Sequence, residues 1–301
     1  MRADFQWQLR SRALELGART VVMGVVNVTP DSFSDGGQFL DAQKAVDHAL
    51  QLLDEGADVL DIGGESTRPG TAVRPDGSDG KPAVSEAEEL QRVMPVIEGV
   101  LSARPDAIVS IDTYKSGVAR RAVEAGAEIV NDVSALQWDI AMAKTCAELQ
   151  CGVVLMHTRG KPSEWRKLPP EPDIASLMAH DLANRAQIAL DSGVKRTHIA
   201  LDPGFGFGKN FEENYPLLAN LGPLQRLGFP ILAGTSRKSF IGRSVGKRRG
   251  GEDAAAGDRL YGSLAAMVAS ILHGAHIVRV HDVRPAVEAA AIADEVLAAK
   301  K

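Results

Sequence analysis

The chain is poor in cysteine: its 301 residues include only two, Cys146 and Cys151. Two cysteines cannot build the disulfide framework of a small secreted domain, and they cannot supply the ligands of a structural zinc site. We therefore expect a protein of a reducing compartment, the cytoplasm, whose stability comes from its hydrophobic core.

The chain also lacks an excess of basic residues and lacks long apolar runs. The formal net charge is −5 and the pI is near 5.8, which argues against a nucleic-acid-binding surface, because such surfaces carry an excess of Lys and Arg. No apolar run approaches the roughly 18 residues of a membrane span, and residues 1–4 do not lead into the apolar stretch of a signal peptide. We expect neither nucleic acid nor a membrane among the partners.

A regular series of short apolar runs is present instead, and each run ends abruptly in polar residues. The residues that follow the eight runs are Asn27, Glu65 to Arg68, Asp112, Asn131 with Asp132, His157, Asp202, Thr235 to Lys238, and His281 with Asp282. A stretch long enough for one amphipathic helix separates each pair of runs. Eight buried strands alternating with helices indicate an α/β protein, the (β/α)8 or TIM barrel, whose strand ends meet at one functional mouth. We expect residues 1–301 to form a single domain of this kind.

The apolar pattern also gives the expected boundaries. We place strands at 21–26, 58–62, 107–111, 127–130, 152–156, 197–201, 229–233 and 275–280. Alternating apolar and polar residues over 4–20 predict a short β-hairpin before the first strand, and such hairpins often plug the bottom of a barrel. Gly56, Gly126 and Gly274 each stand between a helical segment and a strand, which is typical of a helix that ends in a left-handed residue.

Two stretches rich in glycine and polar residues are expected to be loops. Residues 70–83 predict a long loop on the functional face. Residues 244–257, which include the basic run 247–249, predict a second loop before a helix at about 258–273. That helix places four apolar residues on one face, and the part of the face that does not cover the barrel would suit a two-fold contact in a homodimer. The four residues are Tyr261, Leu264, Val268 and Leu272.

The loop after the first expected strand, residues 27–37, carries an amide, several hydroxyls and the carboxylates of Asp31 and Asp35. Pro30 and the paired glycines exclude regular structure. An ordinary loop that uses Asn and Asp for its turns is the alternative, but such a loop would not place Phe33 among carboxylates.

The next loop, residues 63–70, sets Arg68 beside glycines that let the backbone approach a ligand. A guanidinium donates two parallel hydrogen bonds and stays charged, so it suits phosphate. A surface ion pair between Arg68 and Glu65 is the alternative.

Three acceptor-rich side chains, Asp112, Asn131 and Asp202, end the third, fourth and sixth expected strands. Buried carboxylates are costly unless they are paired or hydrogen-bonded. Around one mouth they would suit a flat heterocycle with several N–H donors, such as a pterin. Capping of the following helix is the alternative, most clearly for Asp112 before residues 113–117; the position that the three share favours binding.

The loops after the sixth and seventh expected strands add aromatic rings and cations. Residues 202–209 predict tight glycine turns that present phenylalanine rings and Lys209 to a ligand, although a glycine-rich loop alone is a weak signal. Residues 234–239 lead into a helix near Phe240, and its N-terminal amides, with Lys238 and Ser239, favour an anion.

Arg279 and His281 stand two residues apart on the eighth strand, so both side chains project from one face. Such a pair suits a phosphoryl ligand, whereas His281 alone would be interpreted as a core histidine. His157 has no comparable partner in the sequence and could be structural. Since no Ser-His-Asp set, P-loop or HExxH motif occurs, we expect an electrostatic and positional catalyst.

These motifs resemble the dihydropteroate synthases of the pterin-binding family over about residues 22–283. NVTPDSFSDGG, DIGGESTRPG, SIDTYK, IVNDVSAL, LDPGFGFGK, AGTSRKSFIG and IVRVHDV occur in the family's order and spacing. The resemblance implies a barrel that joins 6-hydroxymethyl-7,8-dihydropterin diphosphate to 4-aminobenzoate, with 7,8-dihydropteroate and pyrophosphate as products. It also implies a requirement for Mg2+ and a homodimer.

The resemblance carries roles onto individual residues. The pterin would be held by Asp112, Asn131, Asp202, Phe207, Lys238 and Arg279. The diphosphate would be held by Asn27, Arg68, Arg279 and His281, with Asn27 also touching Mg2+. The 4-aminobenzoate site would be bordered by Phe33, Thr67, Pro69 and Ser239. Catalysis would fall to Asn27, Asp31, Asp35, Arg68 and Lys238.

Two other functions are compatible with part of this pattern. A folate-dependent corrinoid methyltransferase shares the barrel and the Asp/Asn/Asp set, but its ligand has no diphosphate, which leaves Arg68 and the Arg279–His281 pair without a purpose. A non-catalytic pterin-binding paralogue should have lost some loop residues, and all are present here. The second loop is longer than usual in the family, near residues 74–82, but this departure touches none of the carried-over residues.

Overall fold

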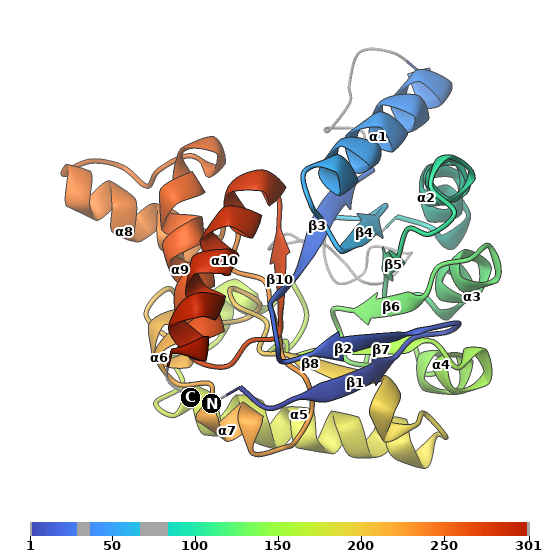
Figure 1. The fold of residues 1–301 in the computed structure, drawn as a ribbon. Helices are drawn as coiled ribbons and strands as arrows, with labels where there is room; N and C mark the ends of the chain where they lie inside the picture. Colours follow the sequence, from blue (N-terminus) through green and yellow to red (C-terminus); the bar gives the residue numbers. More distant parts are fainter. Residues whose placement is uncertain (1, 29–36, 67–83, 300–301) are drawn as a thin grey trace.

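Eight parallel strands stand in a ring at the centre of the computed structural model, which describes residues 2–28, 37–66 and 84–299, the side chains of 37–41 excepted (Figure 1). The strands are β3 (Val21–Asn27), β4 (Val59–Gly63), β5 (Val109–Asp112), β6 (Ile129–Asp132), β7 (Gly152–Met156), β8 (Ile199–Asp202), β9 (Leu232–Ala233) and β10 (Ile277–Val280). Each strand from β3 to β7 pairs with the next along the chain, and β10 lies between β3 and β9. A bridge between Leu201 and Ile231 joins β8 to the segment before β9. The predicted (β/α)8 barrel is confirmed.

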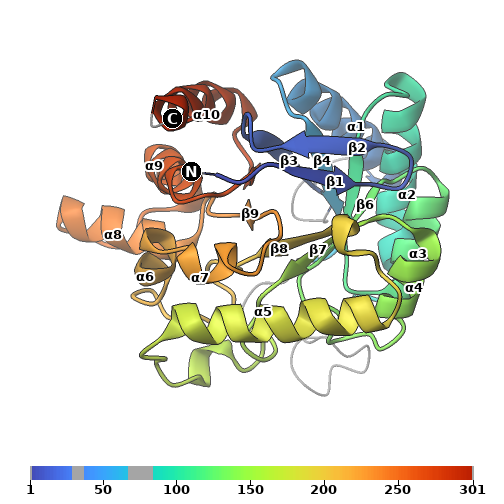
Figure 2. The same ribbon diagram turned by 60° about the horizontal axis from the view of Figure 1, so that its bottom comes forward.

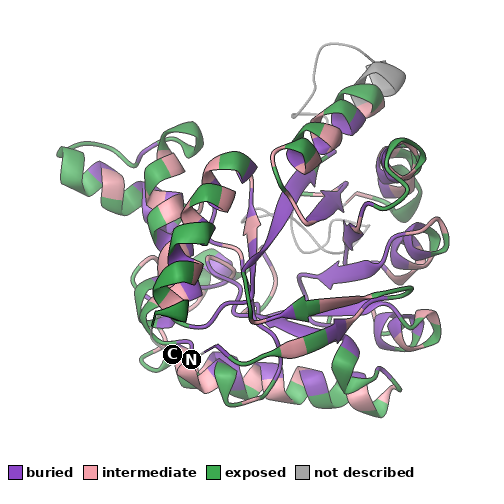
Figure 3. Cartoon of the chain, in the orientation of Figure 1, coloured by how far each residue is buried: buried purple, intermediate pink, exposed green. Residues whose placement is uncertain are grey.

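Helices surround the ring, with their inner faces buried and their outer faces exposed (Figures 2 and 3). They are α1 (Gly37–Asp54), α2 (Glu86–Ala103), α3 (Ser116–Glu124), α4 (Met142–Leu149), α5 (Ile174–Asp191), α6 (Asn214–Ala219), α7 (Gly222–Gln225), α8 (Ser239–Arg249), α9 (Leu260–Leu272) and α10 (Val283–Ala298). No helix in the described ranges is long and apolar enough to cross a membrane.

The predicted hairpin is present and closes the amino-terminal end of the barrel. Strands β1 (Phe5–Gln8) and β2 (Ala13–Leu16) pair antiparallel. Trp7, Leu9 and Leu16 pack in one buried cluster with the first inward-facing residues of the strands. The Trp7 indole donates to the carbonyl of His198 at 2.8 Å, so the largest side chain of the plug has its polar atom satisfied.

The three glycines expected at helix ends adopt positive φ angles: +102° at Gly56, +117° at Gly126 and +105° at Gly274. A residue with a Cβ is disfavoured in this conformation, which explains why glycine stands at each junction.

The loop predicted over 244–257 is wrong at its start, because residues 244–249 belong to α8. The basic run 247–249 forms the last turn of that helix, where positive charge offsets the partial negative charge of the helix end. Gly250, at φ +73°, then ends the helix. A short 3-10 helix, Ala256–Arg259, precedes α9, close to the helix predicted at about 258–273.

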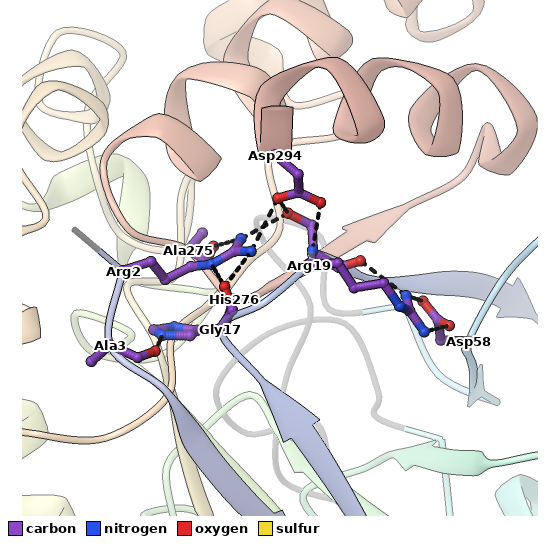
Figure 4. A network of polar contacts seen from close by, with 9 residues as sticks. Arg2, Ala3, Gly17, Arg19, Asp58, Ala275, His276 and Asp294 are labelled. Atoms are coloured by element: carbon purple, nitrogen blue, oxygen red, sulfur yellow. Dashed lines mark hydrogen bonds and ion pairs between the residues drawn. The ribbon is translucent and has the colours of Figure 1, made fainter. Parts of the chain in front are cut away.

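A buried arginine ties the two ends of the chain together at the closed end of the barrel (Figure 4). Arg2 donates to Thr20 at 2.8 Å and to the carbonyl of Ala275 at 3.1 Å, and it pairs with Asp294 of α10 at 3.0 Å. The neighbouring ring of His276 accepts from the amide of Ile231 through Nδ1, which leaves Nε2 to donate to Ala3. The polar groups at this end therefore serve the fold and leave the opposite end for a ligand.

Candidate active site

Polar side chains gather at the carboxyl ends of the strands. The strand registers place Asn27 beside Gly63, Gly63 beside Asp112, Asp112 beside Asn131, and Met156 beside Asp202. Strand alternation decides which residues point inward. Val59, Ile129 and Ile277 belong to the inner cluster at the closed end, so the residue two positions after each also points into the barrel. These three residues are Asp61, Asn131 and Arg279.

Arg279 is the hub of the site. Its Nε lies 2.6 Å from Oδ2 of Asp61, and its Nη2 lies 2.7 Å from Oδ2 of Asp112. Asn131 donates from Nδ2 to the same Asp61 oxygen at 2.9 Å. Asp112 therefore pairs across the barrel, and the alternative that it caps the next helix is not what the structure shows: α3 begins at Ser116.

Asp61, which is fully buried in the middle of β4, was not among the site residues predicted from the sequence. The signal was available, because a lone carboxylate inside the apolar run VLDIG must have a buried partner. Its Oδ1 and the Oδ1 of Asn131 have no hydrogen-bond partner among the described residues. Two buried acceptors without donors, on two residues that are hydrogen-bonded to each other, fit a ligand that brings its own N–H groups.

Burial shifts the ionisation of the groups around this hub. It raises the pKa of Asp112 to about 7, against the opposing charge of Arg279, and the pKa of Asp202 to about 6. Burial, together with the nearby charge of Arg279, lowers the pKa of Lys238 to about 8. Arg279 itself stays charged, because the carboxylates of Asp61 and Asp112 outweigh its burial and raise its pKa.

An apolar wall stands beside the charged groups. The Lys238 ammonium lies 3.9 Å from the centre of the Phe207 ring, and Trp165 meets that ring edge-on at 5.3 Å. Phe207 also packs against a small cluster whose buried members are Tyr114, Val133 and Met156. Met156, which was not predicted as a site residue, ends β7 and points inward beside Asp202. A flat ring could lie between this wall and Arg279.

The glycine-rich loop after β8 differs from the prediction at two residues, Lys209 and Phe205. Lys209 does not face a ligand. It is buried, and its ammonium donates to the carbonyls of Gly204 at 2.8 Å and of His157 and Phe207 at 3.2 Å. Phe205 is likewise part of the core. Lys209 holds the glycine turns in place because their carbonyls need a donor.

A second polar group lies at the end of β10. His281 approaches the hydroxyl of Ser236, with 3.0 Å between Nδ1 and Oγ. Burial and the charge of Arg279 lower its pKa to about 3, so the ring is neutral near pH 7. Ser239 is exposed at the first position of α8, where backbone amides are unpaired in the helix.

His157 is buried, as the structural alternative for it requires. Its Nε2 lies 3.3 Å from Oδ2 of Asp181 on α5, and burial lowers its pKa to about 4. It faces outward to a helix and is separate from the hub.

A buried ion-pair cluster that was not predicted from the sequence lies at the base of the second loop. Lys115 forms ion pairs with Glu65 and with Glu89 of α2. Glu65 in addition accepts from the amide of Val84 at 3.2 Å. The carboxylate that was the alternative partner of Arg68 is therefore already engaged by Lys115.

Six of the predicted site residues lie outside the described part of the chain. They are Asp31, Phe33 and Asp35 in the first loop, and Thr67, Arg68 and Pro69 in the second. Asn27 is described and is exposed at the end of β3.

The chain is similar to known proteins over nearly its whole length. Residues 23–281 match the family model described as pterin binding enzyme. The dihydropteroate synthase of Clostridium beijerinckii is 42% identical over 288 residues, which span 95% of this chain and 98% of that enzyme. Xanthomonas albilineans dihydropteroate synthase with 4-aminobenzoic acid matches with a TM-score of 0.86 and 41% identity, over 98% of this chain and 99% of that chain. The Yersinia pestis dihydropteroate synthase in complex with a sulfonamide drug matches with a TM-score of 0.85 and 38% identity, over 98% and 100% of the two chains.

Proposed function

The chain belongs to the pterin-binding enzyme family, and we infer that it catalyses the dihydropteroate synthase reaction. It is a transferase that condenses 6-hydroxymethyl-7,8-dihydropterin diphosphate with 4-aminobenzoate to give 7,8-dihydropteroate and pyrophosphate. The observation that carries this function is the pair of buried acceptors without donors, Oδ1 of Asp61 and Oδ1 of Asn131, beside the Arg279 hub. A pterin ring supplies N–H groups of the kind that these atoms lack.

We propose that the pterin lies between Arg279 and the wall formed by Phe207 and Met156. Asp61 and the residues predicted from the sequence would then meet its edge; those residues are Asp112, Asn131, Asp202 and Lys238. Carboxylates at these positions serve catalysis as well as binding. When the C–O bond to the diphosphate breaks, positive charge spreads from the methylene carbon into the ring, and nearby carboxylates lower the free energy of that charge.

The diphosphate would lie at the Asn27 side of the mouth, against Arg68, Arg279 and His281. A neutral His281 can donate one hydrogen bond to a phosphate oxygen without adding charge. The arylamine nitrogen of 4-aminobenzoate then forms the new C–N bond and loses its proton to water. We therefore assign no general base, and we propose that Asp31 and Asp35 contribute through charge and position.

Mg2+ fits the donor set that we propose for it. Magnesium prefers oxygen ligands and commonly binds through one or two protein groups together with substrate phosphates and water. Asn27 offers an exposed amide oxygen, and the described residues contain no cluster of three or more acidic, histidine or cysteine ligands that would hold a metal alone. Bound beside the diphosphate, Mg2+ would neutralise charge on the leaving group.

The direct test is turnover of the two substrates by the purified protein, with pyrophosphate release and dihydropteroate formation measured together. A pterin-binding paralogue would bind dihydropterin diphosphate without turnover. A methyltransferase would fail to release pyrophosphate. Removal of Mg2+ with EDTA should stop the reaction, and added Mg2+ should restore it.

Binding of 4-aminobenzoate should depend on pyrophosphate. The proposed 4-aminobenzoate residues Thr67 and Pro69 share a loop with Arg68, and Phe33 shares the loop of Asn27. A diphosphate held by Asn27 and Arg68 should therefore complete the 4-aminobenzoate site, to which Ser239 also contributes. Titration calorimetry should show at least tenfold tighter binding when pyrophosphate and Mg2+ are present, and a sulfonamide should compete. Equal affinity with and without pyrophosphate would refute this order of events.

We further propose a homodimer that uses the outer face of α9 with the adjacent helix α10. Residues of α9 such as Met267 and Ile271 are buried against the barrel, whereas Tyr261 is 82% exposed. On α10, Ile292 is 69% exposed. Apolar exposure on two neighbouring helices is typical of an interface.

Light scattering at micromolar concentration should give the mass of a dimer, and Tyr261→Glu should shift it toward a monomer. Ile140→Glu is the matched control, because Ile140 is 97% exposed and lies far along the chain in the segment before α4. A monomer mass for the unmodified protein would rule the dimer out.

A further inference from the structure

The loop between β9 and α8 contains a residue in a disfavoured backbone conformation. Arg237 has φ +58°, in the left-handed region. A Cβ makes this region unfavourable, and glycine is the residue that normally occupies it. An arginine that stays there must be held by its surroundings, and such residues cluster at functional sites.

Three groups from outside the loop hold Arg237. Its amide donates to Oγ of Ser263 on α9 at 2.9 Å. Its carbonyl accepts from Nη1 of Arg259 at 2.8 Å. Its guanidinium binds Asp282 with both arms, with 3.1 Å from Nε to Oδ2 and 2.6 Å from Nη2 to Oδ1. Backbone and side chain are therefore both fixed.

Arg259, which holds the carbonyl of Arg237, is itself closely packed. Arg259 donates from Nε to the carbonyl of Ala254 at 2.7 Å. A Cβ on Gly242 would come within 2.4 Å of that nitrogen, so the guanidinium has room only because residue 242 is glycine. These residues are not among those proposed to bind substrate. They act on the site only through Arg237.

The neighbours of Arg237 in sequence face different parts of the site. On one side, Ser236 meets His281, at the end proposed for the diphosphate. On the other side, Lys238 lies on the Phe207 ring, at the end proposed for the pterin. Asp282 directly follows His281, so the Arg237–Asp282 pair also joins the ends of the loops after β9 and β10.

We propose that Arg237 is a positioning residue. The two hydrogen bonds from its guanidinium to Asp282 hold the left-handed turn. The turn in turn directs Ser236 toward His281 and Lys238 toward Phe207. A turn that needed only the left-handed angle would be better served by glycine. The presence of arginine indicates that the side-chain anchor is required. This inference rests on the proposed function for the roles of Ser236 and Lys238.

Direct binding measurements test the proposal. The probes are inorganic pyrophosphate with Mg2+, for the Ser236 end, and 6-hydroxymethyl-7,8-dihydropterin, for the Lys238 end. Arg237→Met and Asp282→Asn should each weaken both ligands by tenfold or more, and the double variant should be no worse than either, since both remove one interaction. Arg243→Met is the matched control: Arg243 is an exposed arginine of α8 with a partner 3.8 Å away, and its loss should change neither affinity.

Arg237→Gly separates positioning from a merely structural role. Glycine accepts the φ angle, so this variant should resist denaturant at least as well as Arg237→Met, yet bind both ligands as weakly. Should Arg237→Met and Asp282→Asn fail to fold, Ser263→Ala removes one of the holding bonds and should weaken both ligands in the same direction.

Normal affinity for both ligands in the folded Arg237 and Asp282 variants would overturn the proposal, whatever their stability. If the proposed function is wrong, the experiments give a different result. In that case the unmodified protein would bind pyrophosphate but form no dihydropteroate, and the comparison of variants by pyrophosphate binding would still decide the role of Arg237.

Discussion

Arg279→Met should lower the free energy of unfolding by about 3–5 kcal/mol and abolish turnover. Breaking a buried ion pair costs this much because it leaves a charge without compensation. Here two carboxylates depend on one guanidinium, since Arg279 bonds to Asp61 at 2.6 Å and to Asp112 at 2.7 Å. Denaturant unfolding of the ligand-free variant measures the loss directly.

The loss of unfolding free energy in Arg279→Met should increase with pH. Burial raises the pKa of Asp112 to about 7, above the roughly 3.9 of an unfolded chain. A carboxyl of this kind binds its proton more tightly when folded, so its contribution to stability is complete below about pH 4 and is lost as the pH rises through about 7. Removing Arg279, which opposes this shift, should raise the pKa of Asp112 further. The deficit of Arg279→Met relative to the unmodified protein should therefore be larger at pH 8 than at pH 5.

A compensating variant tests the cause. Adding Asp61→Asn and Asp112→Asn to Arg279→Met removes the uncompensated charges and should recover most of the stability without recovering turnover. If Arg279→Met alone were as stable at pH 8 as the unmodified protein, the account of Arg279 as the hub would fail.

The fold was predictable because its signals are local and repeated. Each strand is an apolar run that ends in a polar residue, and each junction glycine marks a helix end. The local sequence preferences therefore agree with the tertiary structure. The one wrong loop, at residues 244–249, has a weak apolar pattern: only Val245 and Gly246 in it are partly or fully buried. Its helix contacts the segment before Arg259, where the amide of Ala254 donates to the carbonyl of Gly242 at 2.9 Å, and no local pattern reveals this contact.

The site was predictable where position alone decides and unpredictable where pairing decides. A polar residue at a strand end must stand at the mouth, which is how Asp112 and Asp202 were found. Lys209 also follows a strand, but its ammonium turns inward to three carbonyls, and the sequence does not show where those carbonyls point. Asp61 was missed because it lies within a strand, and Arg237 because its importance is in a backbone angle.

Asp202→Asn should keep the fold and lose the pterin. Asp202 accepts from the amide of Gly204 through Oδ1 at 2.7 Å, and an asparagine carbonyl can accept the same bond. Its second oxygen lies near Gly234, and the charge of Lys238 acts on the same carboxyl. An amide NH2 there would face the ring's own N–H donors. A hydrogen bond to a charged group contributes about 1.5–3 kcal/mol, so affinity for 6-hydroxymethyl-7,8-dihydropterin should fall about ten- to 150-fold.

The pH dependence identifies the residue responsible. Burial raises the pKa of Asp202 to about 6. Because Oδ1 accepts from the amide of Gly204, Oδ2 can accept from the ring's N–H groups only when the carboxyl is ionised. Pterin affinity of the unmodified protein should therefore decline as the pH falls through about 6. Calorimetric titrations between pH 5 and pH 8 should show that this decline is missing in Asp202→Asn, whereas a decline near pH 7 from Asp112 should remain. Asp181→Asn, at a partly exposed carboxylate on α5, should titrate like the unmodified protein. Near-normal affinity in a folded Asp202→Asn variant would show that the pterin does not bind at this strand end.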